Sequence, residues 1–249
     1  MTSPDRASPY RASPYRERVG GPGALIVVDH ASAHVPPDVD LGIDPALVQR
    51  HIGWDIGAEA VADLLADRLG CRALFGTVSR LVIDLHREED HPALIPVASD
   101  GHAIPGNAAL DAAARAARIA DYHRPYHARL AAMIDEARPD LIVAVHSFTP
   151  RLETAPDGAR PWQVGILYNQ DERAARVAID ALRAMGIVTG DNEPYSGRLL
   201  NATMNRHAEA RGIPYLAIEV RQDLIDDAAG ARTWAERLLP VIRQCRAIK

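Results

Sequence analysis

The stretch Ala24-Leu25-Ile26-Val27-Val28-Asp29-His30 decides the architecture of this chain. Its five apolar residues follow one another without alternating polar ones, which is typical of a strand buried on both faces of a sheet. The apolar run ends at Asp29 and His30, and small residues and then prolines follow. A strand that is covered on both faces needs helices above and below it, so this stretch predicts an α/β fold.

Strands of the same kind alternate with amphipathic helices along the rest of the chain. We expect further strands at 72–77, 81–85, 141–145, 164–168 and 215–220, and helices at 56–69, 110–138, 172–185, 199–211 and 228–244. This alternation predicts a three-layer α/β sandwich around a central mixed, largely parallel sheet. The helix at 110–138 is expected to break or bend near Pro125, because proline cannot donate a helical hydrogen bond.

The first 22 residues differ in composition from the rest of the chain. The pentapeptide Ala-Ser-Pro-Tyr-Arg occurs there twice in tandem, at 7–11 and 12–16. Proline and polar residues bury too little apolar surface to offset the entropy of ordering. We therefore predict a flexible N-terminal tail over 1–22, followed by a single domain over 23–249.

The overall composition is that of a globular protein of enzyme size, with 249 residues, 47% apolar and 24% charged. A formal net charge of −5 argues against sequence-independent nucleic-acid binding, which requires a basic surface. The chain shows neither an apolar run of about 20 residues nor a signal peptide. We therefore expect no membrane partner and a bacterial or cytosolic, that is cytoplasmic, setting.

Polar residues follow four of the expected strands, at the edge where ligands of open α/β sheets bind. These groups are Asp29-His30, Asp84 with His86-Arg87, His146-Ser147 and Glu219-Val220-Arg221. His30 and His146 each close an apolar strand, and histidine is the commonest protein metal ligand. A catalytic zinc site needs three protein ligands and an open position for water, so these two histidines are candidates for two of the three.

The residues alone leave the third ligand open. Asp55 is the best carboxylate candidate, although an aspartate at the start of a helix is also explained by capping and the helix dipole. His34 lies four residues after His30, but it would approach His30 only in a helix, which the two prolines that follow oppose. Weaker alternatives are Asp29 and Asp84.

Glu219 lies inside an apolar strand, where a carboxylate is unfavourable unless it is paired or functional. Two interpretations remain open from the residues. Burial would raise the pKa of Glu219 toward neutrality and suit it to act as a general base. Alternatively, Glu219 forms a salt bridge with Arg221 or with another arginine.

The strand expected at 81–85 carries charged residues at and beyond both of its ends. Alternation along a strand would place Arg80, Asp84 and His86 on one face and Arg87 on the other. A guanidinium group suits a substrate carboxylate or a developing oxyanion, so Arg87 is a candidate for either role. An exposed ion pair with a neighbouring glutamate is the alternative.

Nine short motifs, which lie in order over most of residues 24–235, resemble the N-formylglutamate amidohydrolase family, also called N-formylglutamate deformylases. They are VDHAS (28–32), GWDIGA (53–58), SRLVIDLHR (79–87), IPGN (104–107), YHRPYH (122–127), VHSFTP (145–150), RPW (160–162), GDNEPY (190–195) and IEVRQDL (218–224). One departure is His86, which stands where many members of the family have an asparagine.

The resemblance implies a phosphorylase/hydrolase-like α/β fold related to zinc carboxypeptidases, and Zn²⁺-dependent hydrolysis of an amide. It implies that His30, His146 and Asp55 are the zinc ligands. It further implies that Glu219 is the general base, while Arg87 stabilises the oxyanion or holds a substrate carboxylate. Further substrate-binding candidates are Arg80, His207, Arg221, Asn192 and Tyr195.

The expected substrate is a small molecule, an N-acylated acidic amino acid such as N-formyl-L-glutamate. Two alternatives remain: a zinc hydrolase of a different N-acyl amino acid or small amide, and a metal-binding relative without turnover. A family name says little about the substrate of one member. The sequence leaves the oligomeric state open.

Overall fold

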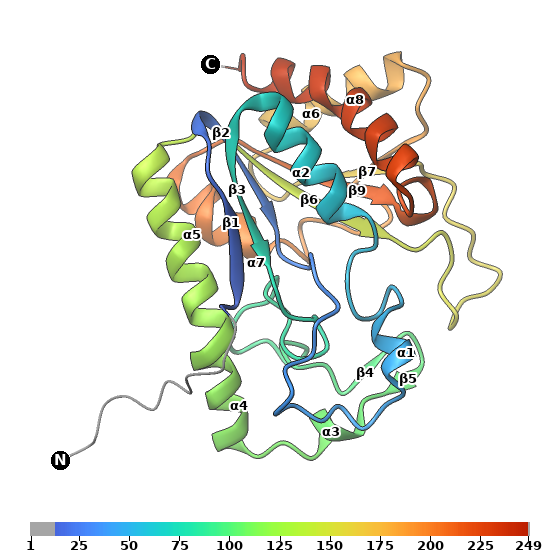
Figure 1. The fold of residues 1–249 in the computed structure, drawn as a ribbon. Helices are drawn as coiled ribbons and strands as arrows, with labels where there is room; N and C mark the ends of the chain where they lie inside the picture. Colours follow the sequence, from blue (N-terminus) through green and yellow to red (C-terminus); the bar gives the residue numbers. More distant parts are fainter. Residues whose placement is uncertain (1–12, 249) are drawn as a thin grey trace.

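A mixed sheet of seven strands forms the middle layer of the computed structural model, which describes residues 13–248 (Figure 1). Its order is β1-β3-β2-β6-β9-β7-β8. The strands are β1 (Tyr15–Arg18), β2 (Gly21–Val28), β3 (Cys71–Gly76), β6 (Leu141–Phe148), β7 (Val164–Leu167), β8 (Thr189–Asp191) and β9 (Tyr215–Arg221). Strands β3, β2, β6 and β9 are parallel to one another. Strand β1 is antiparallel to β3, and strand β7 is antiparallel to β9. The predicted α/β fold with a largely parallel sheet is confirmed.

The central strand β2 is buried on both faces, as its unbroken apolar run predicts. Ile26 and Val28 pack in one cluster with α2 (Ala58–Leu69), α6 (Arg173–Ala184) and α8 (Ala228–Cys245). Leu25 and Val27 pack on the opposite face with α5 (Arg124–Ala137). Figure 1 shows α5 on one side of the sheet and α2 with α8 on the other. The two apolar clusters, one above and one below the sheet, give the predicted three layers.

The helix expected at 110–138 consists of three joined parts. Helix α4 (Ala112–Arg118) continues through a π-helical turn, Ile119–His123, into α5. The widened turn directly precedes Pro125, where a regular helix would bring the proline ring against the carbonyl four residues earlier. The expected disturbance at Pro125 is therefore present, as a wide turn rather than a break.

The remaining elements are short and lie in the connections between the strands and the long helices. They are α1 (Pro45–Val48), β4 (Ala98–Ser99), β5 (His102–Ala103), α3 (Pro105–Ala108), α7 (Ala202–His207) and the 3₁₀ turns Glu209–Arg211 and Gln222–Leu224. The helix expected at 199–211 is thus shorter than predicted. Within residues 13–248 no helix combines the length and the apolar character that crossing a membrane requires.

The segment 81–85 is not a strand, so this prediction was wrong. The segment runs through consecutive turns, and side chains rather than a neighbouring strand satisfy its carbonyls. Asn107 Nδ2 donates to the carbonyl of residue 81 at 2.7 Å, and Arg118 Nη1 donates to that of residue 82 at 2.9 Å. Strand alternation therefore does not apply, and Arg80, His86 and Arg87 reach the same pocket.

Residues 13–22 also differ from the flexible tail that we expected. Strand β1 adds an antiparallel edge to the sheet by pairing with β3. Arg18 of β1 is fixed to α2 by ion pairs with Asp63 at 2.9 Å and Asp67 at 2.6 Å. Backbone pairing and these ion pairs order a segment whose composition alone favours disorder. The rest of the expected tail, residues 1–12, lies outside the described residues.

We predict that Ile142→Ala lowers the free energy of unfolding by about 2–5 kcal/mol, because it leaves a cavity in a fully buried central strand. Val19→Ala is the matched control, since Val19 is 92% exposed, and it should change the free energy of unfolding by no more than about 0.5 kcal/mol. Urea unfolding followed by circular dichroism measures both values. Equal effects of the two substitutions would contradict the assigned core.

Candidate metal centre and active site

The candidate site lies at the carboxyl ends of the parallel strands β2, β6 and β9. His30 lies just beyond the end of β2, and His146 lies near the end of β6. Glu219 is the register partner of His146 on the neighbouring strand β9. Because parallel strands end at the same edge of a sheet, residues that are far apart in sequence meet here, as expected.

His30, Asp55 and His146 form a buried group whose ligand atoms face one another. Asp55 Oδ2 lies 2.8 Å from His146 Nδ1 and 3.4 Å from His30 Nδ1. The backbone N–H of Asp55 donates to the carbonyl of His30 at 3.0 Å, which fixes the loop before α2 against the end of β2. Among the described residues, the groups able to hold a metal do not include His34.

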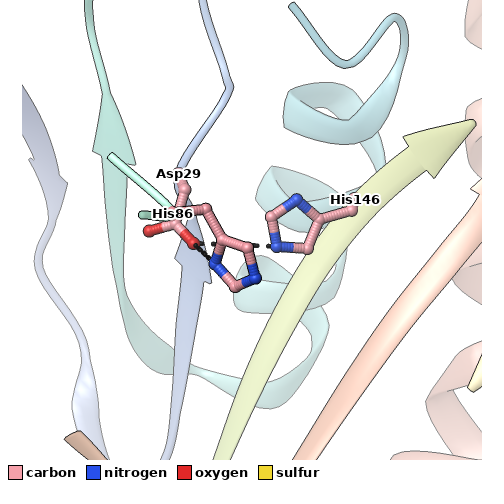
Figure 2. Close-up of side chains that lie close together, drawn as sticks. All are labelled: Asp29, His86 and His146. Carbon is pink, nitrogen blue, oxygen red and sulfur yellow. Dashed lines mark hydrogen bonds and ion pairs between the residues drawn. The ribbon is translucent and has the colours of Figure 1, made fainter. Parts of the chain in front are cut away.

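A carboxylate lies behind each of the two histidines. His30 Nε2 lies 2.6 Å from Asp84 Oδ1, and His146 Nε2 lies 3.7 Å from Asp29 Oδ2 (Figure 2). For His30, the carboxylate at Nε2 favours the tautomer that carries its hydrogen there and leaves Nδ1 free as a ligand atom. His146 Nδ1 instead donates to Asp55 Oδ2, and its Nε2 has no hydrogen-bond partner. Of Asp29 and Asp84, which the sequence offers as weaker ligand candidates, Asp84 therefore supports His30 from behind, whereas Asp29 lies beyond hydrogen-bond range of His146.

Asp29 also anchors His86, and the two form a second group of potential ligands with His146 (Figure 2). Asp29 is fully buried, and its two oxygens already accept hydrogen bonds from Tyr126 Oη at 2.6 Å and His86 Nδ1 at 2.8 Å. His86 Nδ1 has a second contact, with Thr203 Oγ1 at 3.0 Å. Because each oxygen of Asp29 already accepts a hydrogen bond, we interpret this group as the support of the first one.

The buried charges of the site shift one another's pKa values strongly. Burial alone would raise the pKa of Asp55, but Arg80 and His30 lower it well below its usual value. Burial and Arg80 would lower the pKa of His30, but Asp84 and Asp55 raise it to about 9. Burial alone would likewise raise the pKa of Asp84, and His30 holds it well below the usual range. The site therefore concentrates negative charge and favours a cation at its centre.

Arg80 supplies such a cation. Its Nη2 lies 2.6 Å from His30 Nδ1 and also pairs with Asp55 Oδ1, so one guanidinium group contacts two of the candidate ligands. Arg80 Nε is buried without a hydrogen-bond partner. The guanidinium thus lies where the ligand atoms converge.

Glu219 is buried and remains unpaired in the described part of the chain. Its side chain faces the pocket, and its Oε2 has no hydrogen-bond partner. Burial and the charge of Asp55 raise its pKa to about 8. Arg221, the alternative partner considered from the sequence, pairs instead with Asp223 at 2.8 Å. This environment suits a proton acceptor that works near neutral pH.

A pocket of about 170 Å³ opens above these groups. Its lining combines His30, His51, Arg80, His86, Arg87, His146, Ser147, Phe148, Thr149, Leu167, Tyr195, Leu200 and Glu219. The hydroxyl of Tyr195 accepts a hydrogen bond from Arg160 Nη1 at 3.0 Å, and the Arg160 guanidinium lies 4.9 Å from the centre of the Tyr195 ring. The pocket therefore presents guanidinium groups, a positioned phenol and an apolar wall to a small molecule.

Three of the predicted substrate-binding residues lie outside the pocket lining. His207 is buried, and its Nε2 lies 2.9 Å from His127 Nδ1. Arg221 is occupied by its ion pair with Asp223. Asn192 Oδ1 accepts the backbone N–H groups of residues 168 and 197, which shapes the loop that carries Tyr195.

Sequence reasoning did not assign a role to His51, which lines the pocket. His51 Nε2 lies 2.8 Å from Asp100 Oδ2, and the carboxylate of Asp100 also accepts the backbone N–H groups of Glu153 and Thr154. These contacts join three loops around the pocket. The only available signal was the position of His51 two residues before the GWDIGA motif, since its partners are about 50 and 100 residues away in the chain.

The fold and the site together are those of a hydrolase. The sequence model of the N-formylglutamate amidohydrolase family matches residues 23–226, and the chain belongs to this family. Membership of this family supports the assignment of the protein as a hydrolase that acts on amides. No curated protein matches the chain.

Two solved structures resemble the whole chain. The crystal structure of gene product Atu2144 from Agrobacterium tumefaciens is 30% identical, with a TM-score of 0.89 over 94% of this chain and 95% of that one. N-formylglutamate amidohydrolase from Ralstonia eutropha JMP134 is 20% identical, with a TM-score of 0.72 over 95% of this chain and 98% of that one. At 20% identity, the similarity to the second structure shows a shared fold.

The raised pKa of Glu219 predicts a pH dependence of stability in the metal-free protein. The carboxyl titrates at about 8 when folded and near 4.5 when unfolded, so the folded state holds a proton that the unfolded chain releases in this interval. The contribution of Glu219 to the stability of the wild-type protein should therefore fall as the pH rises from about 5 to 8. The Glu219→Gln variant, whose side chain stays neutral, should lose less stability over the same pH interval.

Urea unfolding of chelator-treated protein at pH 5 and pH 8 measures this difference. Contributions of other groups, such as His30, are common to both proteins and cancel in the comparison to first order. An identical loss of stability in wild type and Glu219→Gln would show that Glu219 is not protonated in the folded protein.

Proposed function

We propose that the protein is a zinc-dependent amidohydrolase that cleaves the amide bond of an N-acylated acidic amino acid such as N-formyl-L-glutamate. One observation carries the proposal: the buried His30, Asp55 and His146 group lies beside the unpaired Glu219 in a pocket that two arginines line. Membership of the N-formylglutamate amidohydrolase family supports the same chemistry. The proposal includes the expectations from the sequence of a cytoplasmic location and no nucleic-acid partner.

The donor set fits a zinc ion. Two imidazole nitrogens and one carboxylate are typical of the three protein ligands of a catalytic zinc, and Asp84 orients the imidazole of His30 from behind. The guanidinium of Arg80 acts as a stand-in cation against the same ligand atoms. A zinc ion bound by these residues would supply a Lewis acid and a water molecule of lowered pKa.

Glu219 is the proton acceptor of the proposed reaction. Its carboxylate takes the proton of the attacking water and then delivers it to the nitrogen of the leaving amine. The pKa of about 8 in the metal-free protein falls when a cation is bound nearby, which makes the carboxylate an effective acceptor at neutral pH. No other unpaired carboxylate lines this pocket within residues 13–248.

Arg87 and Tyr195 bind the substrate in this proposal. The Arg87 guanidinium lines the pocket 3.7 Å from Asp84 Oδ2, and its buried Nε lacks a hydrogen-bond partner. A guanidinium with a free donor suits a substrate carboxylate. The hydroxyl of Tyr195, held by Arg160, donates to a second oxygen of the substrate. These donors explain a preference for an acidic amino acid.

One observation favours a substrate other than N-formyl-L-glutamate. His86 lines the pocket beside Arg87, at the position where many family members have an asparagine. An asparagine side chain offers one donor group and one acceptor, whereas the imidazole of His86 uses Nδ1 for Asp29 and has only Nε2 left for a ligand. A different N-acyl amino acid is therefore the second candidate substrate.

Hydrolysis of N-formyl-L-glutamate beside a panel of N-acyl amino acids tests the proposed function. Zinc-loaded wild type should cleave the acidic N-acyl amino acids, and Glu219→Gln should lower kcat/KM by about 10²–10⁴-fold while it keeps the metal. His146→Ala should lose both zinc and activity. Full activity in metal-free protein would contradict the proposal, and cleavage of another amide with N-formyl-L-glutamate untouched would select the second candidate substrate.

We predict that Arg80→Met binds zinc several-fold more tightly than wild type, because the guanidinium no longer competes for His30 and Asp55 or repels the ion. Without metal, the same variant should unfold at a lower temperature, since the buried Asp55 carboxylate loses a partner. Competition with a zinc-binding dye measures the affinity. Arg221→Met, which removes a cation that pairs with Asp223 and not with a candidate ligand, is the control. Weaker or unchanged zinc binding in Arg80→Met would contradict the prediction.

A further inference from the structure

Two buried histidines outside the pocket hold the backbone of the segment that carries His86 and Arg87. His123 Nε2 lies 2.8 Å from the carbonyl oxygen of Arg87, and His127 Nε2 lies 2.9 Å from that of Leu85. The carbonyl between them, that of His86, accepts a hydrogen bond from Arg87 Nη1 at 3.3 Å. Side chains thus satisfy three successive carbonyls of a segment that belongs to no strand.

The partners of these histidines fix which nitrogen donates. A carbonyl only accepts, so His123 and His127 each carry a hydrogen on Nε2. His127 Nδ1 is then the acceptor of His207 Nε2–H at 2.9 Å, and the planes of the two rings are nearly parallel, with their centroids 5.1 Å apart. Burial lowers the pKa of His123 and His127, and burial with Arg206 lowers that of His207 to about 4. All three rings are therefore neutral near pH 7, and their donors keep these roles.

The π-helical turn brings these donors into one row. In a regular α-helix, Arg118 and His123 would point about 140° apart, because each residue turns the helix by about 100°. The turn Ile119–His123 contains an extra residue, so that Arg118 and His123 lie one turn apart and His127 lies a further turn along. The row contacts the carbonyls of residues 82, 87 and 85, so the wide turn adapts the helix to this segment.

We propose that His123 and His127 are positioning residues, which hold the backbone at 85–87 so that the side chains of His86 and Arg87 enter the pocket. Neither histidine lines the pocket, so both act through the residues that they hold. The three candidate ligands lie on other elements, at the ends of β2 and β6 and before α2, and Asp84 is the link between this segment and His30. Loss of either donor therefore changes the binding of an anionic substrate more than it changes the metal site. The consequence for catalysis rests on the proposed function.

Removal and restoration of the His123 donor test the proposal. His123→Leu removes the hydrogen bond to the Arg87 carbonyl, whereas the amide nitrogen of His123→Gln can take the place of Nε2. His123→Leu should raise KM for an acidic N-acyl amino acid by about 10-fold or more, with kcat changed less and zinc content unchanged. His123→Gln should return KM to within about 3-fold of wild type. The pair His127→Leu and His127→Gln should behave in the same way.

Leu130→Ala is the control for a purely structural effect. Leu130 is fully buried in α5, on the same helix, but it is not among the donors to the segment. It should lower the stability of the protein and leave KM unchanged. Equal KM values in His123→Leu and wild type would overturn the proposal, as would a His123→Gln variant as impaired as His123→Leu or a Leu130→Ala variant with the same rise in KM.

A readout without substrate separates this proposal from the proposed function. The Nε–H resonance of Arg87, assigned by its loss in Arg87→Lys, should shift in His123→Leu and return toward its wild-type position in His123→Gln. An unshifted resonance in His123→Leu would overturn the positioning role, whatever the substrate. A shifted resonance in a protein that cleaves no N-acyl amino acid would refute the proposed function and leave the positioning role supported.

Discussion

The carboxylate of Asp55, shared between Nδ1 of His30 and Nδ1 of His146, is the contact on which the rest of the site depends. A buried carboxylate is costly unless charge and hydrogen bonds compensate it. Here the compensation comes from two imidazoles and from Arg80, and the imidazole of His30 is in turn held by Asp84. An arrangement with this many buried acidic groups is stable around a cation.

The sheet makes this contact possible. Parallel pairing of β2, β6 and β9 brings His30, His146 and Glu219 to one edge, and the loop before α2 adds Asp55. The opposite wall of the pocket has no such scaffold. His86 and Arg87 belong to a segment of turns whose carbonyls are held by the side chains of a helix, His123 and His127. The two halves of the site are therefore held by different means, one by strands and one by buried histidines, and the contacts of Asp84 with His30 and of His86 with Asp29 join them.

The local sequence pattern was sufficient to predict the half of the site that the strands position. An apolar run that ends in a polar residue marks His30 and His146, and it also marks Glu219 as a carboxylate in an apolar setting. The other half was mispredicted because the apolar pattern of 81–85 is the same whether a strand or remote side chains satisfy its carbonyls. His51 escaped assignment for a similar reason, since its contacts with Asp100 depend on loops that no local pattern places.

The most direct test of the central claim is a crystal structure of the zinc-loaded protein with anomalous scattering measured at the zinc edge. We expect one strong peak per chain, within bonding distance of Nδ1 of His30, Nδ1 of His146 and the carboxylate of Asp55. The same map should show the Arg80 guanidinium displaced from the ligand atoms. A peak bound by His34, or no peak in zinc-loaded crystals, would contradict the account.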